Sequence, residues 1–377
     1  MIDAPAQALD DPVLRRLAEQ IRGAADTASP LCIRGGRTKD FYGGEPVGAP
    51  LELSDLRGIS SYEPTEMVIT ARAGTRLAEV EAALAEHKQS LAFEPPRFGA
   101  AGTIGGMVAA GLAGPARASV GGVRDFVLGT SLLNGKGDLL RFGGQVMKNV
   151  AGFDVSRVLA GSLGVLGVIC EVSLKVPPLP ARVETLRFVC TQAQAIERVQ
   201  AWSGAPFPVH ASAWRNEVLH LRLAGAKAAV QEAATVLQRD FAGAAVDRDE
   251  AHALWNSLRD QTDPFFRISA KPARPGDPAE RLWRLSMPTT TPPLAVEGEL
   301  LLEWGGALRW LRSAAAPESV RAIAGKAGGS ASLFRSATRG PDFLPAPTAE
   351  IERIHRSLKA AFDPKGVFNR GRLYSWL

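Results

Sequence analysis

Two glycine-rich segments in the first third of the chain limit its possible folds more than any other feature. The first, Arg34-Gly35-Gly36-Arg37-Thr38-Lys39, directly follows the apolar run 31–34, which predicts a short buried strand. The second, Gly102-Thr103-Ile104-Gly105-Gly106, lies after Pro95-Pro96. Glycines allow backbone amides to converge on an anion and allow a bulky ligand to lie against the main chain. Either segment alone is more often an ordinary turn than a binding loop.

Neither segment matches the common nucleotide-binding motifs. A Rossmann fingerprint places G-x-G-x-x-G at the start of a helix, with an acidic residue about 20 positions later, and neither segment does so. No G-x-x-x-x-G-K-[ST] phosphate loop occurs either. A nicotinamide dehydrogenase and a nucleotidase are therefore disfavoured. The net charge of +5 comes from 44 basic and 39 acidic residues spread along the chain, so nucleic acid is not expected as a partner.

Cysteine usage argues against a metal or cluster on this chain. Cys32, Cys170 and Cys190 lie in apolar, strand-like stretches without metal-ligand spacing, so we expect small buried core residues and no metal site. A [4Fe-4S] cluster needs about four thiolates. Residues 1–9 lack the basic start and apolar core of a secretory signal, and the weakly polar run 107–116 is too short to span a bilayer. We expect a cytoplasmic protein.

The sequence of the first half of the chain predicts a mixture of strands and helices, with a hairpin at residues 126–142. An acidic residue before Pro12 predicts a helix start at that point, and Thr75 is placed to cap a second helix. The stretch 98–122 shows no period and is predicted as a long structured loop. Asn134-Gly135 predicts a tight hairpin turn. The predicted elements are a helix to about residue 24, strands 31–34 and 67–73, a helix to about 88, hairpin strands 126–133 and 138–142, a helix 154–160, and a strand 168–176.

Pro177-Pro178 is the predicted domain boundary, which divides the chain into domains 1–178 and 179–377. Beyond it we expect an antiparallel α+β domain. Its predicted elements are a strand 183–190, a helix 192–202, a strand pair around Arg215-Asn216, helices 227–241 and 249–261, strands 282–287 and 299–304, and a C-terminal helix 346–362.

The order and spacing of the glycine motifs resemble a known family. After the two segments come Arg124-Asp125-x-Val127-Leu128-Gly129 and then Gly161-Ser162-Leu163-Gly164-x-Leu166-Gly167-Val168. Together these resemble the FAD-binding domain of the vanillyl-alcohol oxidase type, also called PCMH-type, over residues 1 to about 180. The resemblance implies an α+β fold in which this domain is followed by an antiparallel α+β cap, with the C-terminal helix returning toward the flavin domain.

The resemblance also implies which residues contact FAD. For Val168, the alternative to a contact with FAD is a structural position in a core strand. For Asn369, a structural position in the turn after Pro364 is as probable as a contact with FAD. Some members link the flavin through a His or Cys; the matching loop positions here are Arg37 and Thr38, and 98–122 contains neither residue type, so we expect non-covalent FAD. The implied contacts are Gly35, Gly36, Arg37, Thr38, Lys39, Gly102, Thr103, Ile104, Gly105, Gly106, Gly164, Gly167, Val168 and Asn369.

Within this family, nearly the whole chain resembles the FAD-binding E subunits of bacterial glycolate oxidases. The segments that carry the resemblance are 148–154, 282–286, 303–310 and 362–369. It implies a complex with a second flavin subunit and an iron–sulfur subunit. In such a complex glycolate, a 2-hydroxy acid, becomes glyoxylate and electrons pass through flavin to the iron–sulfur subunit. The partners would also account for any association with the inner face of the membrane.

The sequence departs from the catalytic members of the fold, which carry histidine-rich motifs such as H-G-D-G-N-x-H. Its five histidines are scattered, so no catalytic base is assigned. Only cations for a substrate carboxylate can be nominated, namely Arg284, Arg309 and Arg335, and a salt bridge or solvated position is the commoner role for each. Two alternatives stay open: a stand-alone FAD-dependent 2-hydroxy-acid or alcohol dehydrogenase, and a non-catalytic structural subunit.

Overall fold

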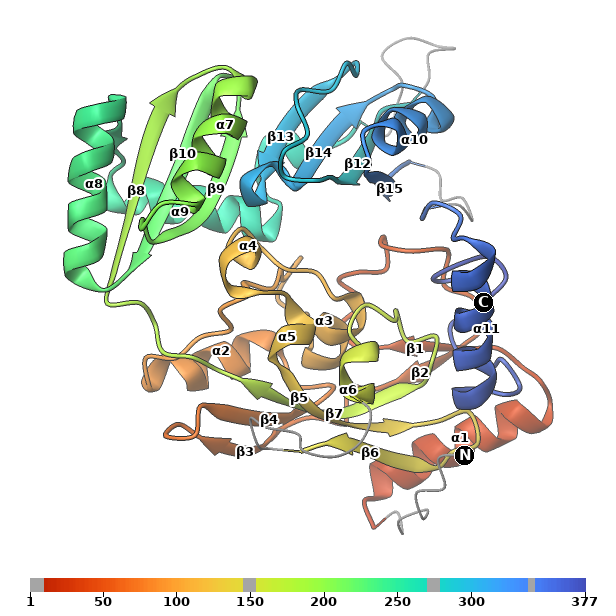
Figure 1. Cartoon of the computed structure of the whole chain (residues 1–377). Helices are drawn as coiled ribbons and strands as arrows, with labels where there is room; N and C mark the ends of the chain where they lie inside the picture. Colours follow the sequence, from red (N-terminus) through yellow and green to blue (C-terminus); the bar gives the residue numbers. More distant parts are fainter. Residues whose placement is uncertain (1–9, 145–153, 270–278, 338–342) are drawn as a thin grey trace.

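The computed structural model describes residues 10–144, 154–269, 279–337 and 343–377. It contains a five-stranded sheet, an eight-stranded sheet and a two-stranded parallel pair, with the eight-stranded sheet above the other two in Figure 1. The predicted α+β class is confirmed. The segment 148–153, which carried part of the sequence resemblance, and the N-terminal residues 1–9 lie outside the described residues.

The five-stranded sheet is antiparallel and forms the lower body of the molecule. The central strand of the sheet is β7 (Val168–Lys175), which is mostly apolar and is buried on both sides. The helix α2 (Leu77–Glu86) packs in the same hydrophobic core. In spatial order its strands are β3 (Ile59–Glu63), β4 (Val68–Arg72), β7 (Val168–Lys175), β5 (Val127–Leu133) and β6 (Leu139–Gly143).

The N-terminal helix α1 (Pro12–Asp26) begins where the sequence predicts. The Asp11 carboxylate accepts from the amides of Val13 (2.8 Å) and Leu14 (3.3 Å), which satisfies two of the free N–H groups at a helix start. The predicted strand 31–34 is β1 (Leu31–Arg34), which pairs in parallel with β2 (Ala49–Glu52).

The prediction of a loop over 98–122 is wrong, because this stretch contains the helices α3 (Ile104–Ala110) and α4 (Arg117–Val120), and α5 (Val123–Phe126) follows directly. Glycines lower helix propensity and hide the period. Burial outweighs propensity here, since Ile104 and Val108 are fully buried and the Thr103 hydroxyl caps α3 by accepting from the Gly106 amide at 3.3 Å.

Two local predictions also need correction. Thr75 does not cap α2; its hydroxyl accepts from the Gly58 amide (2.9 Å) and donates to the Gly58 carbonyl (3.0 Å), and Arg76 takes the cap position. The hairpin is present, but its turn is longer than Asn-Gly alone. The positive φ falls on Gly137 at 75°, and the Asn134 side chain accepts from two following amides, as in an Asx turn.

Helices cover both faces of the first half of the eight-stranded sheet. The predicted helices are confirmed as α7 (Gln192–Ser203), α8 (Lys227–Phe241) and α9 (Arg248–Asp260). In Figure 1, α7 and α8 cover the outer face, and α9 lies on the face toward the lower body. The first strands in spatial order are β11 (Ala244–Ala245), β8 (Arg182–Val189), β10 (Val218–Gly225), β9 (Val209–Arg215) and β13 (Glu299–Glu303).

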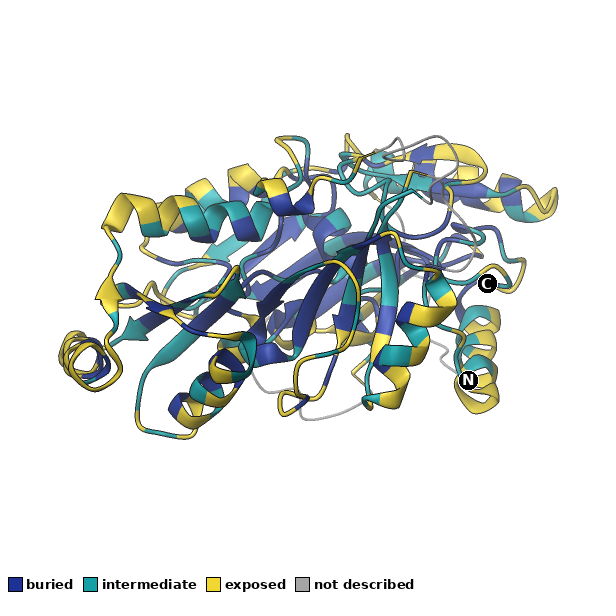
Figure 2. Ribbon diagram, turned by 90° about the horizontal axis from the view of Figure 1, so that it is seen from above, coloured by how far each residue is buried: buried dark blue, intermediate teal, exposed yellow. Residues whose placement is uncertain are grey.

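The sequence predicted only part of the second half of this sheet. Charged residues interrupt the apolar alternation of its strands, which hides them from periodicity. Figure 2 shows the strands buried in the middle of the molecule and the exposed residues concentrated on peripheral helices. The sheet continues from β13 through β14 (Leu308–Ser313) and β12 (Arg281–Ser286) to β15 (Ser330–Arg335), with α10 (Pro317–Lys326) against β15; β14, α10 and β15 were not predicted.

The C-terminal helix α11 (Ala349–Phe362) returns to the lower body, as expected (Figure 1). Phe362 joins the core of the five-stranded sheet, and Phe368 forms a parallel bridge with Leu31. Because β7 ends in one sheet at Lys175 and β8 starts in the other at Arg182, we keep the boundary at residue 178 as a prediction. Within the described ranges, no helix has the length and apolar content needed to cross a bilayer.

Asp363 fixes the segment that follows α11. Its carboxylate is 1% exposed and accepts from the amides of Val367 (3.0 Å) and Phe368 (2.8 Å) and from the Lys359 ammonium (2.8 Å). Lys359 also donates to the carbonyls of Val165 (2.7 Å) and Phe368 (2.9 Å). Burial lowers the pKa of Lys359, and the Asp363 carboxylate opposes that shift. The pair therefore ties the C-terminal segment to the lower body.

We predict that Asp363→Ala lowers the free energy of unfolding by about 3–5 kcal/mol, because it leaves a buried ammonium and two amides without their acceptor. Urea denaturation followed by circular dichroism measures the change. Glu352→Ala on the same helix is the control: it removes an exposed ion pair with Arg356 and should change stability little. Equal, small effects for both variants would contradict the assigned role.

Candidate functional site

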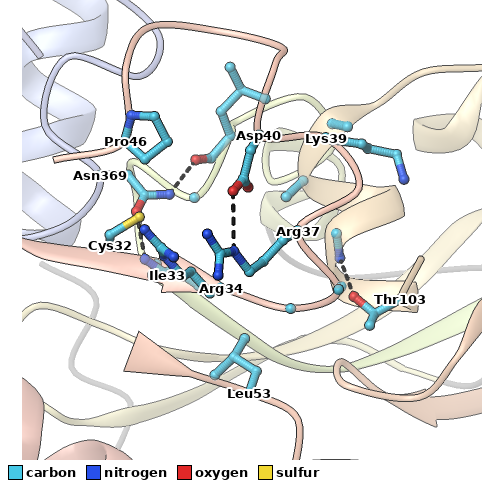
Figure 3. Close-up of a pocket in the computed structure, with 18 of the residues that line it drawn as sticks. Cys32, Ile33, Arg34, Arg37, Lys39, Asp40, Pro46, Leu53, Thr103 and Asn369 are labelled. Carbon is cyan, nitrogen blue, oxygen red and sulfur yellow. Dashed lines mark hydrogen bonds and ion pairs between the residues drawn. The ribbon is translucent and has the colours of Figure 1, made fainter. Parts of the chain in front are cut away.

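A hollow lies where the loop after β1, the start of α3 and the loop before β7 meet (Figure 3). Most of the residues predicted from the sequence line it, although they come from distant parts of the chain. Those lining residues are Gly35, Gly36, Arg37, Thr38, Lys39, Thr103, Gly105, Gly106, Gly164, Gly167 and Asn369.

The first two glycine segments touch each other at the floor of this hollow. A Cβ atom added to Gly36 would lie 1.5 Å from the Ala101 carbonyl oxygen, and one added to Gly35 would lie 2.6 Å from the Thr103 hydroxyl. No side chain fits at Gly36 without separating the two segments. The glycines are therefore required by the approach of one backbone to another, and not by turn geometry alone.

The first segment presents unused hydrogen-bond donors to the hollow. Within the described part of the chain, the amide N–H groups of residues 35–39 donate to no acceptor. Arg37 has a left-handed backbone with φ of 59°. Successive right-handed and left-handed residues turn their amides toward one point. Unpaired amides are rare in folded proteins, and a concave run of them is typical of an anion-binding nest.

The second segment contributes space and few donors. The amides of Ile104 and Gly105 donate to the carbonyls of Thr75 (3.0 Å) and Ala73 (2.8 Å), and that of Gly106 donates to the Thr103 hydroxyl. Gly105 also lets α3 lie against Ala73, since its Cβ would come 2.6 Å from that methyl group. This segment forms the wall of the hollow opposite the unpaired amides.

Three predicted residues do not line the hollow. Ile104 and Val168 are fully buried in the hydrophobic cores, and the Gly102 carbonyl accepts from the Leu77 amide at 2.8 Å. Their side chains or backbone support the segments that do line it. The cofactor contacts expected for these three residues stay predictions.

Asn369 lines the hollow and also holds two of its walls together. Its side-chain oxygen accepts from the Ile33 amide (2.8 Å), and its side-chain nitrogen donates to the Leu163 carbonyl (2.6 Å). A Cβ on Gly164 would lie 2.6 Å from that nitrogen, which explains the glycine at that position. Asn369 thus lies in a turn and also lines the hollow, and its expected contact with FAD stays a prediction.

The charged side chains around the hollow are mainly cationic. Burial lowers the pKa of Lys39 to about 8, and Asp260 partly offsets this shift. The Arg34 Nε–H is buried and has no hydrogen-bond partner. Figure 3 shows Arg37 turned to Asp40, with an Nε to carboxylate distance of 3.4 Å. Among the described residues that line the hollow, Asp40 is the single carboxylate beside four cations, so the hollow suits an anionic ligand.

Sequence reasoning missed several lining residues, because no local pattern marks them. Arg372 is the most informative of these: its guanidinium donates to the carbonyls of Tyr42 (2.6 Å) and Asp40 (3.2 Å) and so fixes the chain after the first segment. The missed residues are Cys32, Ile33, Arg34, Asp40, Pro46, Leu53, Ala109, Ala110, Leu163, Ile169 and Arg372.

The three cations nominated for a substrate carboxylate have different surroundings. Arg309 is fully buried and donates to the backbone carbonyls of Gly306, Pro292 and Thr291, so it is structural. Arg335 donates to the Gln261 side chain at 3.1 Å and stacks on Phe41. The Arg284 side chain has no hydrogen bond or ion pair with any described residue and stacks over Trp304.

The histidines do not form a catalytic group. Burial lowers the pKa of His210 to about 4, with the positive charge of Arg222 adding to the shift, and burial also lowers the pKa of His220. Both are therefore neutral at pH 7. Among the described residues, no three His, Cys, Asp or Glu side chains are grouped in a way that could hold a metal ion.

FAD fits the hollow on the features above. The unpaired amides suit its pyrophosphate, the buried Arg34 Nε–H needs an acceptor, and the glycines leave the main chain open to a bulky ring system. A comparison with protein families agrees, because residues 15–143 match the family described as FAD binding domain.

Comparisons with known proteins extend the likeness to the whole chain. Glycolate oxidase subunit GlcE of Escherichia coli is 43% identical over 361 residues, which cover 96% of this chain and 97% of that protein. Glycolate oxidase subunit GlcD of Bacillus subtilis is 30% identical over 158 residues, or 42% of this chain and 34% of that protein.

A solved structure of alkyldihydroxyacetonephosphate synthase shares the fold, with a TM-score of 0.64 and 14% identity over 94% of this chain and 74% of that one. At this identity the likeness concerns the fold alone. With an FAD binding domain at its N-terminal end and a relative that matches it almost from end to end, the chain belongs to the family of glycolate oxidase subunit GlcE.

Proposed function

We propose that this chain binds one FAD without a covalent bond and serves as a flavin-bearing subunit of a glycolate oxidase complex, which oxidises glycolate to glyoxylate. The run of unpaired amides at residues 35–39 carries the proposal, because it supplies a preformed site for the pyrophosphate. Bound FAD would supply the two-electron acceptor for a 2-hydroxy acid. The contacts proposed for it are those at residues 35–39, 102–106, 164, 167, 168 and 369.

The proposal includes partner subunits, because a reduced flavin needs an outlet for its electrons. The cysteines are free and buried at three separate sites, so they do not form a cluster-binding set. We therefore propose a second flavin subunit and an iron–sulfur subunit as partners. We place the complex in the cytoplasm, with any association with the inner face of the membrane made through those partners.

An anaerobic absorption spectrum tests this function. We expect the purified chain to be yellow with about one FAD per chain, and glycolate to bleach the flavin only when the partner subunits are present. Bleaching of the chain alone would favour a stand-alone 2-hydroxy-acid or alcohol dehydrogenase. A colourless chain that takes up no FAD would overturn the proposal and leave a structural subunit.

We predict that Gly36→Ala lowers FAD affinity at least tenfold, because the new methyl group cannot fit beside the Ala101 carbonyl and must separate the two segments. Fluorescence titration of flavin into FAD-free protein measures the affinity. Gly23→Ala in α1 is the matched control, since a Cβ there meets nothing within 4 Å. Circular dichroism must show both variants folded; an unchanged affinity in folded Gly36→Ala would contradict the assigned site.

We further predict that acid precipitation releases all of the flavin into the supernatant. Cys32 is the thiol to check, because it lines the hollow, although it is 4% exposed and lies in β1 beneath the loop. Mass spectrometry of the proteolytic peptide that contains Cys32 should show its unmodified mass. Flavin that stays with the precipitate, or a flavin adduct on that peptide, would disprove non-covalent binding.

A further inference from the structure

We propose that this chain has its own binding site for a small 2-hydroxy carboxylate where the two sheets face each other, with Arg284 binding the carboxylate and Glu303 accepting from the hydroxyl. The inference deepens the proposed function and takes its substrate class from it. It assigns substrate contacts to a chain in which the sequence reveals no catalytic group.

Glu303, at the end of β13, has an unused carboxylate oxygen. The residue is 4% exposed; its Oε2 accepts from the Trp310 indole N–H at 2.7 Å, and its Oε1 is buried without any hydrogen-bond partner. A buried carboxylate oxygen without a donor is unfavourable, so its presence calls for a ligand or another explanation. A hydroxyl group is a suitable donor for this atom.

Arg284, on β12, supplies an unused cation beside it. Arg284 is the cross-strand neighbour of Trp310, the same residue whose indole binds Glu303. Its guanidinium lies over the Trp304 ring, 5.3 Å from the centroid, and has no hydrogen bond or ion pair with a described residue. A guanidinium in this state can bind a carboxylate through two parallel hydrogen bonds.

The turn after Glu303 holds an unusual backbone that orders this site. Trp304, Gly305 and Gly306 all have positive φ, at 54°, 64° and 90°. Such a backbone is costly for a bulky residue like tryptophan, and strain of this kind is concentrated at functional sites. The Trp304 indole donates to the Gly114 carbonyl at 3.0 Å, which anchors the ring across the two domains.

The charges around Glu303 favour an anionic ligand. Glu94 already pairs with Arg222 at 2.8 Å, and Arg117 lies 4.5 Å from the Trp304 centroid, so positive charge is in excess. Burial raises the pKa of Glu303 to about 7, with the Glu94 charge adding to the shift and the hydrogen bond from Trp310 opposing it. The charged or titratable groups on the packed elements are Glu94, Arg117, His210, Arg222 and Arg284.

The chain that follows α3 leads from the flavin hollow to the proposed site. Ala109 and Ala110 at the end of α3 line the hollow, and the chain that follows reaches Gly114, the acceptor for Trp304. Ala110 and Trp304 also belong to one hydrophobic cluster. The Trp304 ring under Arg284 therefore packs in the same cluster as a residue that lines the hollow.

Isothermal titration calorimetry of the full-length chain, with FAD and without it, tests the inference. The ligands are glycolate and acetate, which differ in the hydroxyl group. We expect Arg284→Gln to lower the affinity for both ligands at least tenfold. Arg187→Gln is the matched control, because Arg187 is an exposed guanidinium on β8 of the same sheet. This control should bind both ligands as the unchanged chain does.

The role of Glu303 is tested by pH. Ionisation of Glu303 adds a negative charge, so acetate affinity should fall as pH rises from 6 to 8, through a pKa of about 7. The ionised carboxylate also accepts the glycolate hydroxyl, so the preference for glycolate over acetate should increase over the same range. In Glu303→Gln, neither the acetate affinity nor the preference for glycolate should change with pH. Glu197→Gln, on the exposed side of α7, is the control and should keep both pH dependences.

The outcomes separate this inference from the proposed function. FAD uptake with no glycolate binding, or with binding that Arg284→Gln leaves intact, overturns the inference and leaves the FAD proposal standing. Glycolate binding with the expected variant effects in a chain that takes up no FAD supports the inference and overturns the FAD proposal. A pH dependence that persists in folded Glu303→Gln overturns the assignment of the hydroxyl to that residue.

Discussion

The approach of Gly36 to the Ala101 carbonyl is the constraint on which the binding region depends. With a projected Cβ distance of 1.5 Å, no side chain can occupy this position while the two segments stay in contact. The amides of residues 35–39, in the same loop, have no acceptor among the described residues. The free donors and the missing side chain thus occur together, where one backbone packs closely against another.

The second half of the chain completes this region from two directions. The C-terminal segment supplies Asn369, whose amide side chain holds β1 to the loop before β7, and Asp363, which fixes the turn that presents it. The eight-stranded sheet approaches from the other side, where the Trp304 indole donates to the Gly114 carbonyl in the chain after α3. Neither sheet alone contains all the groups that a flavin and its substrate would need.

Much of the fold could be predicted from the sequence, because strong local signals mark it. Pro12 and the helical spacing of the predicted helices are local signals, and the helices they indicate are present, whereas the domain boundary at Pro177-Pro178 stays a prediction. The helix α3 was missed because its glycines serve tertiary packing at the expense of propensity. Glu303 was missed because its carboxylate is unusual only through burial and one unpaired oxygen, which no sequence pattern reports.

The tie made by Asn369 has a consequence for biosynthesis. Its partner amide on Ile33 lies 336 residues earlier, in β1, so the two meet only after almost the entire polypeptide has been translated. A nascent chain that has made only the N-terminal domain still lacks one wall of its cofactor cleft. The lining of the hollow is therefore complete only once residue 369 has been translated and has reached β1.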